Sequence, residues 1–244
     1  AGAKQQVVRK TSNIDVERAR VDFSYFCDVV GEKPPATHMR LWHEHLCTGN
    51  NSECLMGIAG PNVDILAPRG SAKSTVLGLF TAWSIGVHAF HKKPLKILYI
   101  SYTVDVARPK SAAIKRIIEE NKHYKEIFPM VKIAKGINSN EYWSIDWKFA
   151  GIRSTGEEEF TVCCAGLKGA VTSKRSHLCI IDDAIKSADD IKNKDIRAAM
   201  EDNWNSVIVP TMFEGARAIC LGTRFRHDDI HNTTFTPAND WVQI

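Results

Sequence analysis

Short apolar runs alternate with longer amphipathic segments along most of the chain, from about residue 60 to the end of the sequence. Brief runs rich in valine, isoleucine and leucine are typical of buried strands, and apolar residues that recur every three or four positions are typical of helices. Strands that are apolar along their whole length have both faces covered. The pattern therefore predicts an α/β fold in which a mostly parallel central sheet carries helices on both faces.

The expected strands are Val63–Leu66, Leu95–Ser101, His177–Asp182 and Ala216–Thr223, and the expected helices are Ser74–Phe90, Asp105–Asn121 and Ile191–Val209. Residues Tyr142–Gly166 combine β-favouring residues with a turn signal at Thr155-Gly156, which predicts antiparallel strands or a hairpin. We expect this segment to form an antiparallel edge of the sheet.

The first part of the chain has a helical pattern instead. A helix is expected over Ile14–Val30, a break at Gly31–Pro35, and a second helix for which Thr37 provides the N-cap. We expect one domain over residues 1–244, with a helical lead-in at 1–34 and the α/β core at 35–244.

The composition is that of a globular protein with one large core. The chain has 244 residues, of which 44% are hydrophobic, and this is enough for one core. Its seven cysteines include no C-x-x-C pair, which is typical of reduced thiols in a cytosol. The N-terminus lacks an apolar signal segment, and the apolar run Val76–Phe90 is too short to span a bilayer. We expect an intracellular soluble protein with no membrane contact.

The net charge is +4, and the excess is concentrated in one segment. Lys92–Lys148 contains twelve Lys and Arg against six Asp and Glu. Such a bias is typical of a solvated face, and it also suits a surface that contacts a polyanion such as nucleic acid. Charge alone leaves both interpretations open.

The stretch DILAPRGSAKST, Asp64–Thr75, joins the first expected strand to the first expected helix. A phosphate-binding loop has the pattern G-x-x-x-x-G-K-[ST] in this position, but alanines here replace both glycines around Gly70. Lys73 can reach phosphates, Ser74 can ligate Mg²⁺, and the amides of a helix N-terminus bind anions. Alanine fits at Ala72 if this position needs no positive φ. The alternative is an ordinary strand, turn and helix with an exposed lysine.

Two other expected strands end in residues that suit phosphate chemistry. HLCIIDD ends in Asp182-Asp183, and buried carboxylates are costly unless a cation meets them. In phosphate-loop ATPases the first acid holds the Mg²⁺ shell and the second orients the attacking water, although Asp183 is alternatively a helix N-cap. A third strand ends in Gly222-Thr223-Arg224, which can contact a γ-phosphate at the carboxyl edge of the sheet. Together these endings predict a nucleotide hydrolase.

These stretches resemble the large terminase subunits of tailed double-stranded-DNA bacteriophages, the motor ATPases that package genomes into capsids. The matching stretches are APRGSAKST, LKILYISYTVDVARPKSAAIKRIIEEN, AGLKGAVTSKRSHLCIIDD and LGTRFRHDDI. They occur in the family's order and spacing from about residue 35 to the end of the chain. The loop form Pro-Arg-Gly-x-Ala-Lys-Ser-Thr is common in this family, so the resemblance identifies the alanines as a family variant.

The resemblance implies a phosphate-loop ATPase domain with ATP and Mg²⁺ as its ligands. The residues expected to bind the nucleotide are Pro68, Arg69, Gly70, Ser71, Ala72, Lys73, Ser74 and Thr75. Lys73 takes the place of the phosphate lysine, and Arg69 that of the loop arginine at the γ-phosphate. Ser74 and Asp182 take the places of the Mg²⁺ ligands.

The resemblance also implies a catalytic role for the other strand ends. Asp183 falls where the family often has the catalytic glutamate. Thr223 and Arg224 match the motif that is said to couple hydrolysis to movement. The adenine-contacting segment is expected around Pro35–His43, without a residue that we can assign.

The implied function is ATP hydrolysis that drives double-stranded viral DNA into a preformed capsid. The implied partners are double-stranded DNA, the capsid portal, the small terminase subunit and further copies of this chain, which can be a monomer in isolation. The implied place is the cytoplasm of the infected bacterial host, outside the mature virion. Large terminases also have a C-terminal nuclease domain, for which the residues after Arg224 leave no room, so we expect an isolated ATPase domain without nuclease activity.

Three other functions remain open from the residues, and one of them is a nucleotide-binding protein without turnover. Another phosphate-loop translocase or helicase shares the sheet and its acids but brings a second nucleotide-clasping domain. A zinc-binding interaction module is suggested by HEHLCTGNNSEC, which offers His43, His45, Cys47 and Cys54. An amphipathic helix with a buried cysteine explains the same stretch.

Overall fold

The computed structural model describes residues 14–31, 33–47, 60–154, 160–169, 171 and 174–244. Within these residues, eight strands form one mixed sheet in the order β3-β4-β5-β2-β6-β7-β1-β8. The strands are β1 (Asn62–Leu66), β2 (Ile97–Ser101), β3 (Ile133–Asn138), β4 (Tyr142–Ile145), β5 (Val162–Gly166), β6 (Ser176–Asp182), β7 (Met212–Gly222) and β8 (Trp241–Gln243). The sheet is parallel from β5 to β8, whereas β3 and β4 pair antiparallel at the edge. The predicted α/β fold with an antiparallel edge is therefore confirmed.

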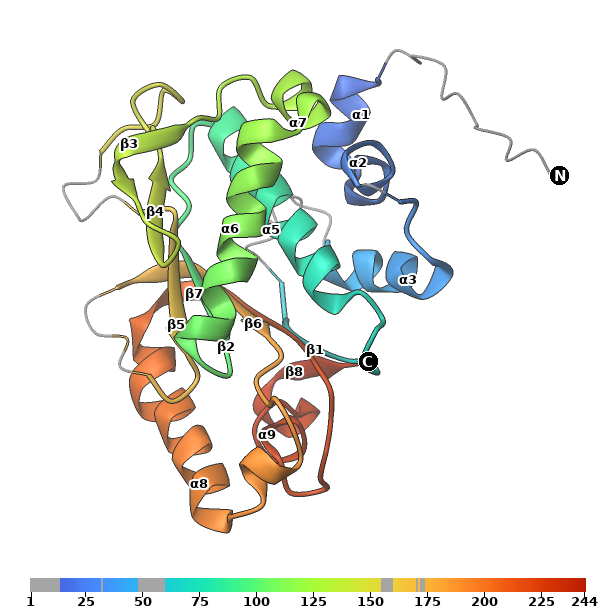
Figure 1. Cartoon of the computed structure of the whole chain (residues 1–244), viewed down its shortest axis with the longest axis vertical. Helices are drawn as coiled ribbons and strands as arrows, with labels where there is room; N and C mark the ends of the chain where they lie inside the picture. The colour runs from blue at the N-terminus through green and yellow to red at the C-terminus, as the bar shows by residue number, and fades with distance from the viewer. Residues whose placement is uncertain (1–13, 32, 48–59, 155–159, 170, 172–173) are drawn as a thin grey trace, which may run out of the picture.

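Helices cover both faces of this sheet (Figure 1). The helices are α1 (Val16–Val21), α2 (Phe23–Val30), α3 (Thr37–Leu46), α5 (Lys73–Phe90), α6 (Val104–Glu120), α7 (Lys122–Ile127), α8 (Lys194–Asn203) and α9 (Ile230–Thr233). On β2, Ile97 and Tyr99 belong to the core under α5 and α6, and Leu98 and Ile100 belong to the core that contains Met200 of α8. Because successive strand side chains point to opposite faces, one apolar strand serves both cores.

Several boundaries differ from the predicted ones. The expected helix Ile14–Val30 is two helices, because the Asp22 side chain accepts a hydrogen bond from Tyr25 N at 2.9 Å and starts a new helix. The N-cap of α3 is Ala36, so the prediction of Thr37 as N-cap was wrong. The predicted helix Ile191–Val209 is also not one continuous helix.

In place of that long helix, α8 ends at Asn203 and continues as a π turn, Trp204–Ile208, and a 3₁₀ turn, Val209–Thr211. Pro210 lacks an amide hydrogen and cannot extend a regular helix. Strands β3 and β8 and helix α7 were not predicted, because they are short and only partly buried or weakly periodic. The predicted turn at Thr155-Gly156 and residues 1–13 of the lead-in lie outside the described residues.

Candidate phosphate-binding site

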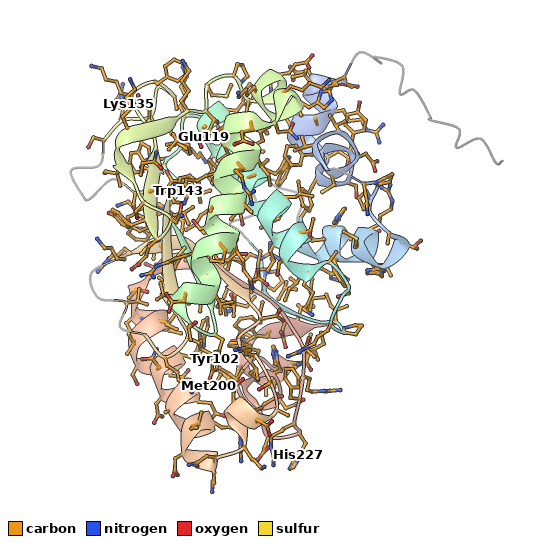
Figure 2. The ribbon with its side chains drawn as sticks, in the orientation of Figure 1. Tyr102, Glu119, Lys135, Trp143, Met200 and His227 are labelled. Atoms are coloured by element: carbon orange, nitrogen blue, oxygen red, sulfur yellow. The ribbon has the colours of Figure 1, made fainter. Side chains whose placement is uncertain are left out.

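The carboxyl ends of β1, β2, β6 and β7 meet at one edge of the sheet, beside the N-terminus of α5. A pocket of about 410 Å³ lies there. Its lining residues are Arg69, Gly70, Ala72, Lys73, Ser74, Thr75, Tyr102, Val106, Lys110, Asp183, Ile185, Lys186, Thr223 and Phe225. Figure 2 shows Tyr102 near the lower end of α6, away from Glu119 and Lys135 near the top. The topology therefore collects residues from distant sequence stretches into one pocket.

The loop between β1 and α5 needs two left-handed backbone positions. Gly70 has φ +80°, a conformation that glycine adopts without steric strain. Ala72, the N-cap of α5, has φ 62° and ψ 27°. The condition that this position needs no positive φ was therefore wrong. An L-residue in this region costs about 1–2 kcal/mol, which the loop tolerates here without a glycine.

Lys73 is buried at the first position of α5 and extends back across the loop. Its Nζ donates to Pro68 O at 3.0 Å, to Ala67 O at 3.1 Å and to Thr223 Oγ1 at 3.0 Å. Nζ also lies 3.7 Å from Asp183 Oδ1. The ammonium thus connects the loop with the ends of β6 and β7. It is not the exposed lysine of an ordinary turn.

Asp182 is fully buried and its carboxylate is surrounded by donors. Ser74 Oγ donates to Oδ1 at 2.9 Å, and Tyr99 OH donates to Oδ2 at 2.7 Å. Lys110 Nζ lies 3.0 Å from Oδ2. Burial, together with the charge of Asp182, raises the pKa of Tyr99 well above its ordinary value, so the phenol keeps its proton. A hydroxyl and a carboxylate this close are hard oxygen donors of the kind Mg²⁺ takes, so the residues fit that ion.

Asp183 follows the end of β6 in a left-handed conformation, φ 55°. Its amide donates to Leu221 O at 3.0 Å, and no helix begins at this residue. The next helical turn, Asp189–Ile191, has Ala188 as its N-cap. The alternative of Asp183 as a helix N-cap was therefore wrong. Burial raises the pKa of the Asp183 carboxyl above its ordinary value, against the opposing charge of Lys73.

The two arginines differ in position. Arg69 lines the pocket, donates to the carbonyl oxygen of Lys186 and lies 5.5 Å from the centre of the Phe225 ring. Arg224 is exposed and donates to Asn232 Oδ1 at 3.2 Å. The described residues that line the pocket do not include it.

The remaining loop residues mainly shape the turn and its junction with β7. Ser71 Oγ donates to Pro68 O at 2.7 Å, so this hydroxyl stabilises the turn. Thr223 Oγ1 accepts from Lys73 and donates to Ala67 O at 3.0 Å, which joins β7 to the loop. Thr75 lines the pocket, whereas Pro68 and Ser71 do not belong to its described lining.

Sequence reasoning missed Lys110, Tyr99 and Ser101. Lys110 Nζ contacts Asp182 O at 3.1 Å as well as its carboxylate, and Ser101 Oγ donates to the same carbonyl at 2.6 Å. The signal available in the sequence was weak: a lysine early in the helix after a buried strand, and a polar end to an apolar strand. Neither indicates which carboxylate lies opposite.

A second polar group lies behind the site, and it was also missed. His231 Nδ1 of α9 lies 3.0 Å from both carboxylate oxygens of Asp64 of β1, and all of these groups are buried. The His231 ring packs on Gly222, where an added β-carbon would lie 2.4 Å from Cε1. Gly222 thus allows the ring to approach the strand that carries Thr223 into the pocket.

The zinc-module interpretation finds no support in the described residues. His43 Nδ1 and Ser24 Oγ share a hydrogen bond of 2.7 Å, and burial lowers the pKa of His43 to about 4. Burial raises the pKa of the Cys47 thiol to about 12. Cys54 lies outside the described residues. Where the structure is described, metal-ligating side chains gather elsewhere, at Asp64, Cys220 and His231.

Comparison with known proteins gives a structural likeness alone. No family model and no curated protein matches the sequence. One similar solved structure is the large terminase ATPase domain of Thermus phage P74-26, with 15% identity over 80% of this chain and 72% of that chain, and a TM-score of 0.38. A mutant of the same domain has 14% identity over 78% of this chain and 70% of that chain, with a TM-score of 0.39. Likeness at this level assigns no chemistry. In the part of the chain that is described, no helix is long and apolar enough to cross a bilayer.

Proposed function

We propose that this chain is a Mg²⁺-dependent ATPase. One observation carries the proposal: Lys73 and Ser74 at the N-terminus of α5 contact the acidic pair at the end of β6. The distances are 3.7 Å from Lys73 Nζ to Asp183 Oδ1 and 2.9 Å from Ser74 Oγ to Asp182 Oδ1. A helix N-terminus, a buried lysine, a hydroxyl and two carboxylates are the set of groups that phosphoryl transfer to water requires.

Each residue has a distinct task in this proposal. Lys73 exchanges its loop carbonyl partners for phosphate oxygens, and the amides at the start of α5 orient the phosphate chain. Ser74 and Asp182 would hold Mg²⁺, which when bound would neutralise charge on the phosphates. Asp183 accepts a hydrogen bond from the attacking water, and the raised pKa makes its carboxylate a stronger base than an exposed aspartate. Arg69, at the pocket wall, stabilises charge on the transferred group.

The nucleoside has a suitable place beside the phosphate pocket. A second cavity of about 1020 Å³ lies between α5, α6 and the segment that connects α2 to α3. It shares Ala72, Ser74, Thr75 and Lys110 with the phosphate pocket. We place the base and ribose there, against Pro34, Pro35 and Ala36 of the connecting segment and Met39 of α3. The connecting segment overlaps the start of Pro35–His43, the stretch that the sequence predicted to contact adenine.

The proposal extends to double-stranded DNA, moved into a viral capsid by a homo-oligomer that docks on the portal with the small terminase subunit. These partners and the host cytoplasm follow from the sequence resemblance. The exposed basic residues of the segment 92–148 are Lys92, Lys93, Arg108, Arg116, Lys122, Lys125, Lys132, Lys135 and Lys148. Figure 2 shows Lys135 near the top of the molecule and Tyr102 below the lower end of α6, so DNA phosphates can meet Lys135 away from the phosphate pocket. Arg116, in contrast, lines the second cavity.

The test is phosphate release from ATP and Mg²⁺, measured with and without double-stranded DNA at several salt concentrations. Turnover should require Lys73, and DNA binding should fall steeply with salt and vary little with sequence. The matched control is Lys194→Met, which removes an exposed charge on α8, outside the basic segment 92–148 and outside both pocket linings. Absence of turnover under all conditions, with a folded protein, would refute the ATPase. Strand separation without translocation along duplex DNA would instead indicate a helicase.

A further inference from the structure

We propose that Lys110 is the resident counter-ion of Asp182 and that it makes this site select a metal–nucleotide complex over a free divalent cation. The identity of the nucleotide rests on the proposed function, whereas the central test uses the metal alone. Lys110 is not one of the site residues that the sequence predicted in the loop and at the strand ends.

The contacts of Lys110 hold its ammonium among three oxygens. Nζ lies 3.0 Å from Asp182 Oδ2, 3.1 Å from Asp182 O and 3.4 Å from Ser101 Oγ. The Lys110 side chain is 18% exposed and that of Asp182 is 0% exposed. Since a buried carboxylate is costly without a cation, this ion pair offsets part of the cost of burying the Asp182 side chain.

The same contacts place Lys110 in competition with a metal. Asp182 Oδ1 already accepts from Ser74, and Oδ2 accepts from Tyr99 and faces Lys110. A cation held by Asp182 and Ser74 would sit within a few ångströms of the ammonium. Two positive charges at that separation repel strongly where water is largely excluded. We therefore expect Lys110 to move away from Oδ2 when a divalent cation binds.

After this move, the position of Lys110 allows its ammonium to contact a bound nucleotide. Lys110 lines both the phosphate pocket and the adjoining nucleoside cavity. A nucleotide brings phosphate oxygens to this shared wall, so the displaced ammonium exchanges a carboxylate for a phosphate. A free metal brings no anion, and Lys110 then loses its partner without replacement. The result is that metal and nucleotide bind together far better than the metal binds alone.

The experiment measures binding of Mn²⁺ by electron paramagnetic resonance, first without nucleotide. Lys110→Met should bind free Mn²⁺ about tenfold or more tightly than the wild type, because one nearby positive charge is removed. Lys125→Met removes an exposed charge from the same basic segment and should match the wild type. Adding Asp182→Asn to Lys110→Met should abolish the gain. Lys110→Gln is the second variant if the methionine variant does not fold.

Equal affinity of the wild type and both Lys110 variants for free Mn²⁺ would overturn the proposal. So would a gain that survives Asp182→Asn, because the new site would then lie elsewhere. A separate arm titrates Mn²⁺ with ATP. Wild-type protein that fails to bind this complex would refute the nucleotide function, while the metal-only comparison would still decide the role of Lys110.

Discussion

The left-handed conformation of Ala72 leads to a prediction of unusual sign: Ala72→Gly should stabilise the protein. Ala72 has φ 62° and ψ 27° at the N-cap of α5 and is exposed. A side chain in this conformation costs about 1–2 kcal/mol relative to glycine. Because the methyl group is exposed, its removal forfeits little apolar burial.

The effect of the substitution on the unfolded chain reduces this gain in stability. Glycine increases the conformational entropy of the unfolded state, which lowers stability by about 0.4–1 kcal/mol. The net increase in the free energy of unfolding is therefore about 0–1.6 kcal/mol, with a midpoint of about 0.8 kcal/mol. For a chain of 244 residues, this midpoint corresponds to a rise in Tm of about 1–4 °C.

The assay is thermal and urea unfolding of Ala72→Gly beside Ala112→Gly. Ala112 lies in the interior of α6, where glycine should lower the free energy of unfolding by about 1 kcal/mol. The two substitutions are chemically identical and should have opposite signs. If Ala72→Gly lowered Tm as much as Ala112→Gly does, the strain argument would fail.

The remaining predictions concern the site. Lys73→Ala should abolish turnover and weaken ATP binding, measured by phosphate release and calorimetry; normal hydrolysis would remove Lys73 from the phosphate site. Asp183→Asn should bind ATP without cleaving it, and because burial raises the pKa of Asp183, the acidic limb of the wild-type pH–rate profile should lie above the ordinary range for aspartate. Arg69→Ala should lower kcat by about 10³–10⁵ with ATP affinity retained, whereas Arg224→Ala should mainly lose stimulation by DNA; the reverse result would exchange the two roles. Gly222→Ala should lower the free energy of unfolding by about 1–3 kcal/mol, because its β-carbon would overlap the imidazole packed on it; an unchanged Tm would show that the ring moves freely.

The sequence by itself determined the local elements and the kinds of residue at the strand ends. Buried strands such as Ile97–Ser101 are apolar along their whole length, and the helix Lys73–Phe90 is long and strongly apolar, so periodicity identifies them. Spacing within one stretch also placed Lys73 beside Ser74 at a helix start, since these residues are neighbours in the chain. Periodicity reports burial, however, and it does not name the partner across the interface.

The tertiary structure alone decided which distant side chains meet and what conformation the loop takes. Lys110 and Asp182 are 72 positions apart, and His231 and Asp64 are 167 positions apart. Their contacts depend on the strand order, in which β2 lies beside β6 and β1 beside β7. The positive φ of Ala72 depends likewise on how the end of β1 must turn into α5, because closure of the loop fixes its backbone against the local preference of alanine.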